Sequence, residues 1–117
     1  MSAVPPKPWA PERGDAVWLD FDPSSGHEQG GRRPAVVLTA SRYNGRVGLA
    51  MMCPVTHREK GYPWEVALPA GLPVSGVVLA DQARSVDWRS RNAKFLCCMP
   101  GGFIESVVER VQALLEL

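Results

Sequence analysis

The residues best suited to chemistry lie in one short polar stretch, residues 26–34. Around a glycine pair it carries a carboxylate (Glu28), an amide (Gln29) and two guanidinium groups (Arg32 and Arg33). A carboxylate can act as a general base, and an arginine suits bidentate contact to a phosphate while staying charged at physiological pH. A simple turn does not require so many polar groups. The alternative interpretation is a solvated glycine hairpin whose charges only favour solubility.

Two apolar runs hold this polar loop at its ends. Residues 16–21 alternate between apolar and polar side chains, which is the period of a half-buried strand. Residues 35–39 begin with a continuous apolar run typical of a central strand covered on both faces. Pro34 fixes its own φ and favours an extended backbone at Arg33. We therefore expect the Arg33 guanidinium to be aimed by the chain.

The rest of the sequence predicts more short strands and one helix. Asn44-Gly45 predicts a protruding turn, and residues 56–63 a second polar loop. Further strands are expected at residues 47–53, 64–68, 76–79, 81–86 and 95–99. After Pro100, apolar residues recur at spacings of three and four, which predicts an amphipathic helix. This order indicates a mainly β fold, a small and strongly bent antiparallel barrel with a C-terminal helix packed against it.

Length and composition favour a single folded domain that does not span a membrane. The chain has 117 residues, of which 45% are hydrophobic and 21% charged, so we expect one folded domain over residues 12–117. Residues 1–11 contain four prolines and predict a flexible proline-rich tail. No apolar run approaches the ~20 residues that span a bilayer, and no signal peptide is visible, so we expect a cytoplasmic protein without membrane contact.

Cysteines and histidines give no support for a metal site. Cys53, Cys97 and Cys98 make an odd count without the paired spacing of zinc ligands, and the chain has only two histidines. We expect reduced, mostly buried thiols, and neither a metal nor a cofactor.

Charge is unevenly distributed, although the formal net charge is only +1. Residues 32–60 sum to +5 and residues 84–94 to +3, whereas residues 12–31 sum to −4 and residues 95–117 to −2. Two basic segments beside strands could merge into one positive face suited to a phosphate backbone. The alternative is a set of arginines scattered over a solvated rim.

Several motifs in one order resemble the MazF/PemK family of toxin endoribonucleases, over about residues 12–117. They are Gly14-Asp15, Trp18, Asp20-Phe21-Asp22-Pro23, Gly26, Glu28-Gln29, Gly31, Arg33-Pro34-Ala35-Val36-Val37-Leu38, Pro54, Thr56, Lys60-Gly61-Tyr62-Pro63, Leu79-Ala80-Asp81-Gln82 and Arg84-Ser85. The resemblance implies an SH3-like barrel, a homodimer, and sequence-selective, metal-independent cleavage of single-stranded RNA. It also implies neutralisation by a cognate MazE-like antitoxin.

The resemblance implies three catalytic residues, Glu28, Arg33 and Thr56. Metal-free RNA cleavage needs a base near the 2′-hydroxyl, positive charge near the phosphorane and a proton source for the leaving oxygen. Glu28 could be the base, or could only pair with Arg32 or Arg33. Arg33 is a better electrostatic stabiliser than general acid, but its place in the motif leaves both roles open. Thr56 could donate to a phosphate oxygen, or be a turn residue.

Other polar residues are candidates for RNA contact, since glutamine can read a splayed base edge and cations bind phosphates. These candidates are Gln29, Arg32, His57, Arg58, Lys60, Gln82 and Arg84.

Two alternative functions stay open. Related gyrase-poisoning toxins share the barrel and bind a protein, but they end in Trp-Gly-Ile, whereas this chain ends Leu115-Glu116-Leu117. A dimer could also bind RNA without cutting it.

Overall fold

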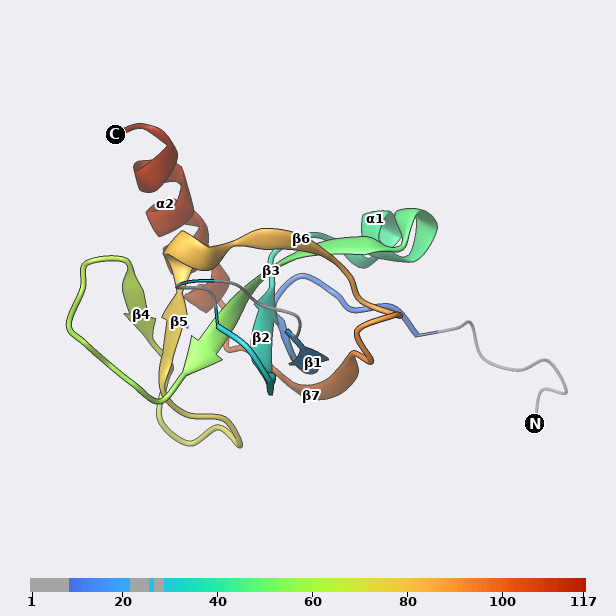
Figure 1. Cartoon of the computed structure of the whole chain (residues 1–117), viewed down its shortest axis with the longest axis horizontal. Coiled ribbons are helices and arrows are strands. Elements are labelled where there is room, and N and C mark those ends of the chain that lie inside the picture. Colours follow the sequence, from blue (N-terminus) through green and yellow to red (C-terminus); the bar gives the residue numbers. More distant parts are fainter. Residues whose placement is uncertain (1–8, 22–25, 27–28) are drawn as a thin grey trace, which may run out of the picture.

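The computed structural model describes residues 9–21, 26 and 29–117 (Figure 1). Glu28 and His27 therefore lie outside the described residues. The elements in chain order are β1 (Asp15–Asp20), β2 (Arg32–Val37), α1 (Ser41–Val47), β3 (Leu49–Thr56), β4 (Glu65–Ala67), β5 (Val77–Leu79), the 3₁₀ turn η1 (Ala80–Gln82), β6 (Arg84–Asp87), β7 (Lys94–Cys98) and α2 (Phe103–Leu115).

The strands form one antiparallel sheet in the order β4-β5-β3-β2-β1-β7, with β6 joined to β3. The mainly β fold with a C-terminal helix is confirmed. The closed barrel is not, because the path of paired strands in the described chain runs from β4 to β7 without returning.

Strand β3 is the centre of this sheet (Figure 1). One edge pairs with β2, with Val36 opposite Cys53. The other edge pairs first with β6, from Leu49 to Met52, and then with β5 at Val55 and Thr56. The end of β3 is thus held where the sheet passes from β6 to β5.

Apolar side chains are buried on both faces of the sheet, which explains the continuous apolar run in β2. On one face Val36 and Val55 pack with Ile104 and Val107 of α2. The opposite face forms a second cluster that includes Val17, Leu19, Phe21, Met52 and Trp88. Fully burying a side chain such as Val107 stabilises the fold by about 1.5–3 kcal/mol.

The predicted turn at Asn44-Gly45 is wrong, because residues 41–47 form helix α1 and the following strand begins only at Leu49. The Asn44 side chain is buried, and its Nδ2 donates to the carbonyls of Pro11 (2.8 Å) and Thr39 (2.7 Å). These tertiary bonds outweigh the local preference of an Asn-Gly pair for a turn.

Residues 9–11, which we expected within the tail, pack against the body of the protein. Pro11 is buried and accepts the bond from Asn44. The Trp9 ring meets the buried Trp88 ring edge-on, with centroids 5.8 Å apart.

The three cysteines are free and differ in exposure. Cys53 is buried as expected, and burial, with a smaller contribution from the charge of Asp81, raises the pKa of its thiol to about 12. Cys97 is half-buried, whereas Cys98 is exposed, so the expectation of mostly buried thiols is wrong for Cys98. Across the described ranges, no helix has both the length and the apolar character to cross a bilayer.

Candidate active site

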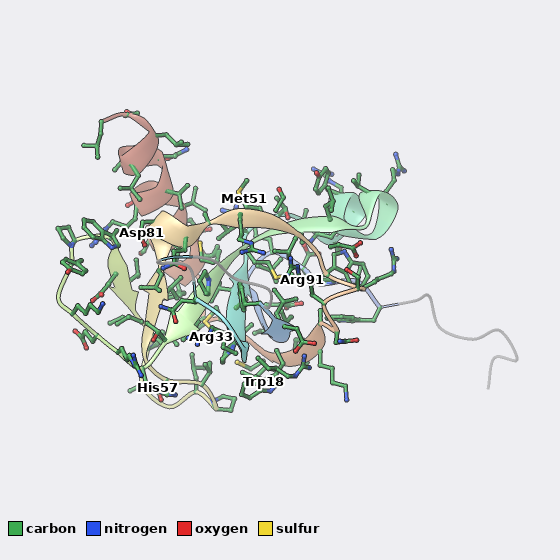
Figure 2. All side chains as sticks on the ribbon, viewed as in Figure 1. Trp18, Arg33, Met51, His57, Asp81 and Arg91 are labelled. Carbon is green, nitrogen blue, oxygen red and sulfur yellow. The ribbon has the colours of Figure 1, made fainter. Side chains whose placement is uncertain are left out.

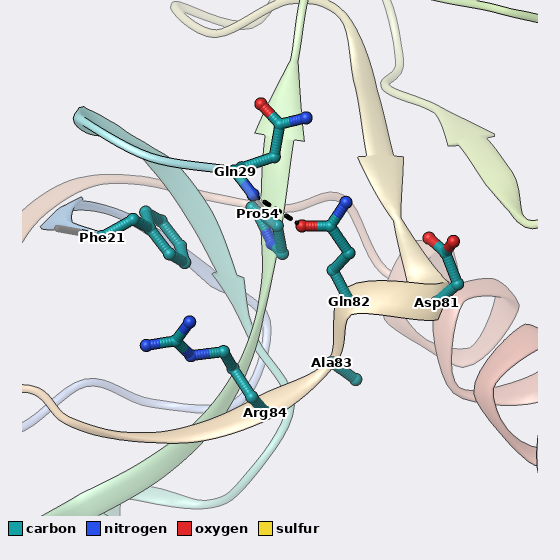
Figure 3. Close-up of a pocket in the computed structure, with 7 residues that line it drawn as sticks. All are labelled: Phe21, Gln29, Pro54, Asp81, Gln82, Ala83 and Arg84. Carbon is teal, nitrogen blue, oxygen red and sulfur yellow. Dashed lines mark hydrogen bonds between the residues drawn. The ribbon is translucent and has the colours of Figure 1, made fainter. Parts of the chain in front are cut away.

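Three adjoining clefts surround the end of β3. The main cleft, about 560 Å³, is lined by Gln29, Arg33, Thr56, Arg58, Lys60, Tyr62, Trp64, Glu65, Leu79, Asp81 and Gln82. The side cleft, about 340 Å³, is lined by Trp18, Arg32, Arg33, Pro34, Val55, Thr56, His57, Pro73, Val74 and Ser75. The small pocket, about 170 Å³, is lined by Phe21, Gln29, Pro54, Asp81, Gln82, Ala83 and Arg84 (Figure 3).

The clefts bring together every described residue that the sequence nominated. Arg33 and Thr56 line both the main and the side cleft, so they stand where these two meet. The seven nominated RNA contacts are divided among the three clefts, and Figure 2 shows Arg33 and His57 near the same end of the sheet. The position of Glu28 relative to them lies outside the described residues.

Arg33 lies in strand β2, which begins at Arg32, earlier than the sequence predicted. The strand is longer because its pairing with β1 continues to Asp20 opposite Arg32. The Nε of Arg33 donates to the carbonyl of Gly30 at 2.9 Å. This bond orients the guanidinium while leaving its terminal N–H groups to make the two-pronged contact that suits a phosphate.

Thr56 is the last residue of β3 and only 6% exposed. Its Oγ1 accepts a bond from the Arg58 N–H at 3.1 Å, which is the turn role considered as the alternative. The hydroxyl proton can still be donated, since a hydroxyl both accepts and donates. Gly76 presses on this residue from β5's side: a Cβ at Gly76, whose φ is +117°, would lie 2.3 Å from the Thr56 carbonyl oxygen. Only glycine allows that approach.

Arg32 is engaged in a network at the rim of the side cleft. Its Nη1 pairs with Asp20 at 2.9 Å and its Nη2 donates to the Asn92 carbonyl at 3.0 Å. Asn92 Nδ2 in turn donates to Asp20 at 2.7 Å. The bond from Asn92, followed by that from Arg32, lowers the pKa of Asp20. Arg32 therefore ties β2 to the turn after β6, and its contact with RNA stays a prediction.

In the small pocket, a hydrogen bond from the Gln29 backbone holds the Gln82 side-chain amide in place (Figure 3). The Gln29 N–H donates to Gln82 Oε1 at 3.0 Å. Because a backbone N–H can only donate, the accepting atom is the oxygen, and the Gln82 amino group points the other way. Asp81 stands next to it on η1, and partial burial, followed by the charge of Glu65, raises the pKa of Asp81. The Arg84 guanidinium lies 5.9 Å from the centre of the Phe21 ring.

Sequence reasoning missed the aromatic and acidic lining of these clefts. Tyr62 and Trp64 stack with centroids 4.7 Å apart and planes 17° apart. Glu65 and Asp81 also line the main cleft, and Trp18 lines the side cleft. The available signal was the pair of aromatic residues directly after Arg58 and Lys60, since aromatics interleaved with cations are typical of single-stranded nucleic-acid sites.

The arrangement suits a polymer of phosphates and flat bases. Arg33, Arg58 and Lys60 give the main cleft cations, and the stacked rings give it an apolar face. In the part of the chain that the structure describes, no group of three or more histidine, cysteine, aspartate or glutamate side chains is placed to hold a metal ion.

Comparison with known proteins gives consistent matches. A family described as PemK-like, MazF-like toxin of type II toxin–antitoxin system matches residues 12–115. The chain is 49% identical over 85 residues to the endoribonuclease toxin MazF of Escherichia coli K12, covering 73% of this chain and 76% of that protein. It is 38% identical over 111 residues to the endoribonuclease toxin ChpB of the same strain, covering 90% and 94%.

Comparison with solved structures gives matches to the same family of proteins. A crystal structure of MazF from Deinococcus radiodurans superposes with a TM-score of 0.90 at 55% identity, covering 94% of this chain and all of that one. A MazE-MazF crystal structure from the same organism matches with a TM-score of 0.82 at 50% identity, covering 94% of this chain and 99% of the matched chain.

Proposed function

The chain belongs to the family of PemK-like, MazF-like toxins of type II toxin–antitoxin systems, and on that premise we propose that it cleaves single-stranded RNA where the main and side clefts meet. It is an endoribonuclease, the activity for which its curated relatives are named. The observation that carries the location is that Arg33 and Thr56, from two neighbouring strands, line both clefts.

The proposed reaction uses the RNA's own 2′-hydroxyl as nucleophile, because that group is tethered beside the phosphorus and has a large effective concentration. A base, proposed to be Glu28, takes the 2′-proton, the 2′-oxygen bonds to phosphorus, and the bond from phosphorus to the 5′-oxygen breaks. The departing 5′-oxygen takes up a proton from solvent, and Glu28 later releases the 2′-proton to solvent, so the protons balance. The products are a 2′,3′-cyclic phosphate and a 5′-hydroxyl.

Arg33 and Thr56 act on the phosphate in this proposal. The Arg33 guanidinium, oriented through Gly30, stabilises the charge that grows on the non-bridging oxygens. The Thr56 hydroxyl accepts a hydrogen bond from the Arg58 N–H and donates a hydrogen bond to a phosphate oxygen. Gln29, Arg58, Lys60, Gln82 and Arg84, with His57 and Arg32 on the other side, hold the flanking nucleotides.

The proposal includes two protein partners. A homodimer is expected from the family, and a cognate MazE-like antitoxin is supported by the antitoxin complexes of similar toxins. We expect the antitoxin to present an acidic, disordered segment that competes with RNA for the cationic clefts.

A substrate with one altered position tests the reaction. We expect the enzyme to cut a long transcribed mRNA in excess EDTA and to leave 2′,3′-cyclic phosphate and 5′-hydroxyl ends. A short oligonucleotide centred on a mapped cut should resist cleavage when the nucleotide just upstream carries 2′-deoxyribose, since this change removes the nucleophile without changing charge. Cutting of the deoxy substrate at the same bond would mean that water is the nucleophile. An intact mRNA would favour a protein-binding toxin or a non-cutting RNA binder.

A further inference from the structure

The stacked pair Tyr62 and Trp64 lies on a turn that several independent bonds hold in place. The Glu65 N–H donates to the Tyr62 carbonyl at 3.1 Å, closing a four-residue turn with Pro63 at its second position, where proline's fixed φ fits. The Glu65 carboxylate accepts from the N–H groups of Lys60 (3.1 and 3.2 Å) and Gly61 (2.9 Å). The turn is therefore fixed from within.

Neighbouring elements hold the same turn from outside. The Trp64 carbonyl accepts from the Ala80 N–H of η1 at 3.1 Å. The Pro63 carbonyl accepts from the guanidinium of Arg110 on α2. Two segments distant in sequence thus hold the backbone that carries the aromatic pair.

This rigid turn exposes a large aromatic surface to the main cleft. Tyr62 is 47% exposed although one side of its ring is covered by Trp64. Neither residue belongs to the two apolar core clusters of the described chain, so the fold does not use the pair as core. An exposed flat ring beside Arg58 and Lys60, in the cleft that also holds Arg33 and Thr56, matches what single-stranded nucleic acids bind: cations for phosphates and a ring for a base.

We propose that Tyr62, supported from behind by Trp64, is the stacking platform for a base of the bound single strand next to the cleaved bond, and so a residue that sets affinity and substrate choice. This inference rests on the proposed function, because it assigns the occupant of the same cleft. Arg58 and Lys60 bind the phosphates that flank that base. The platform contacts substrate without taking part in proton transfer, so its loss acts on binding and leaves the bond-breaking step intact.

The experiment measures binding and cleavage separately. Binding of a fluorescein-labelled oligonucleotide, centred on a mapped cut and blocked by 2′-deoxyribose, is followed by anisotropy. If no cut can be mapped, a labelled random-sequence single-stranded RNA serves as the probe. Tyr62→Ala and Tyr62→Leu should weaken binding about 5- to 100-fold, while Tyr62→Phe keeps it within about 3-fold, because stacking needs an aromatic ring and not the hydroxyl. With the cleavable RNA, KM should rise by a similar factor at an unchanged kcat.

The matched control is Phe95→Ala, which removes a 52% exposed aromatic side chain of β7 that lines none of the three clefts. It should leave binding unchanged. Thermal unfolding of each variant checks the fold, and Tyr62→Phe keeps the test valid if Tyr62→Ala unfolds.

The two proposals fail in different ways. If wild-type protein cuts RNA but Tyr62→Leu binds it as tightly as wild type, the platform is refuted and the cleavage site stands. If wild type binds RNA without cutting, and Tyr62→Ala weakens that binding, the cleavage proposal is refuted and the platform stands. Wild-type protein that neither binds nor cuts refutes both.

Discussion

In the main cleft Arg33 and Thr56 stand on strands β2 and β3, whereas Tyr62 and Trp64 stand on a turn that precedes β4. The strand residues around the first pair, such as Val36 and Val55, are buried in the core. The turn is exposed and depends on one carboxylate, that of Glu65, for three of its bonds. Arg33 and Thr56 are thus held by strands packed in the core, and Tyr62 and Trp64 by polar bonds within the turn and from η1 and α2.

This difference fits the role proposed for each pair. Stabilising a transition state requires groups placed to a fraction of an ångström, which core packing provides. Stacking on a base tolerates small shifts, because dispersion and hydrophobic contact are spread over the whole ring. Substitutions in the two pairs should therefore separate catalysis from binding.

The largest effect is expected at Arg33. Arg33→Ala should reduce kcat by at least ~10²-fold, because it removes the charge that stabilises the phosphorane. The fold should change little, since the substitution removes a single bond, worth about 0.5–1.5 kcal/mol, to the Gly30 carbonyl. Cleavage assays and thermal unfolding measure the two quantities. Arg42→Ala, which removes an exposed arginine of α1 away from the three clefts, is the control. Wild-type cleavage by Arg33→Ala would reject Arg33 as the group that stabilises the phosphorane. Loss of the fold would show that Arg33 mainly stabilises the structure.

A smaller effect, on stability and activity together, is expected at Gly76. Gly76→Ala would place a methyl group 2.3 Å from the Thr56 carbonyl and impose a strained φ, so we expect a loss of about 2–5 kcal/mol in the free energy of unfolding. The displaced Thr56 should also lower kcat in whatever fraction stays folded. Gly71→Ala is the matched control, since Gly71 has a φ of +88° but open space where the Cβ would lie. If Gly76→Ala and Gly71→Ala cleave RNA equally well, the close approach to Thr56 is not the reason that position 76 needs glycine.

The smallest effect is expected at Glu65. Glu65→Gln keeps one acceptor but loses the charge that strengthens the bonds to Lys60 and Gly61, so the turn should loosen by about 1 kcal/mol and KM rise a few-fold at unchanged kcat. Glu59→Gln removes a neighbouring exposed carboxylate with no side-chain bond in the described residues and controls for charge. Since losing a negative charge favours RNA, tighter binding by both variants would show that the carboxylate does not organise the turn.

The sequence predicted those features that depend on local pattern. Alternation located β1, with Val17, Leu19 and the following Phe21 inward, and spacing located α2. The motif residues Arg33 and Thr56 do share a cleft. Helix α1 could not be foreseen, because Asn44 is held there by Pro11, 33 residues away in sequence.

The sequence also could not predict which side chains pair across neighbouring strands. Arg32 was weighed as a partner of Glu28, yet its described partner is Asp20, which the β1–β2 register places opposite it. The stacking of Tyr62 on Trp64 depends on the geometry of one turn and on bonds from η1 and α2. Sequence spacing alone contains no such information.

The double-sided pairing of β3 also determines how the enzyme can lose its shape. An amide in a strand with neighbours on both edges exchanges its hydrogen with solvent only when a large cooperative unit opens, while amides in an exposed turn exchange through small local fluctuations. The amide of Met52, which lies opposite Val37 of β2 and Arg84 of β6, should therefore exchange at the rate set by global unfolding, and those near Tyr62 much sooner. Local opening of the folded protein then exposes the amides of the turn that carries Tyr62, while strand β3, which carries Thr56, stays paired until the whole domain unfolds.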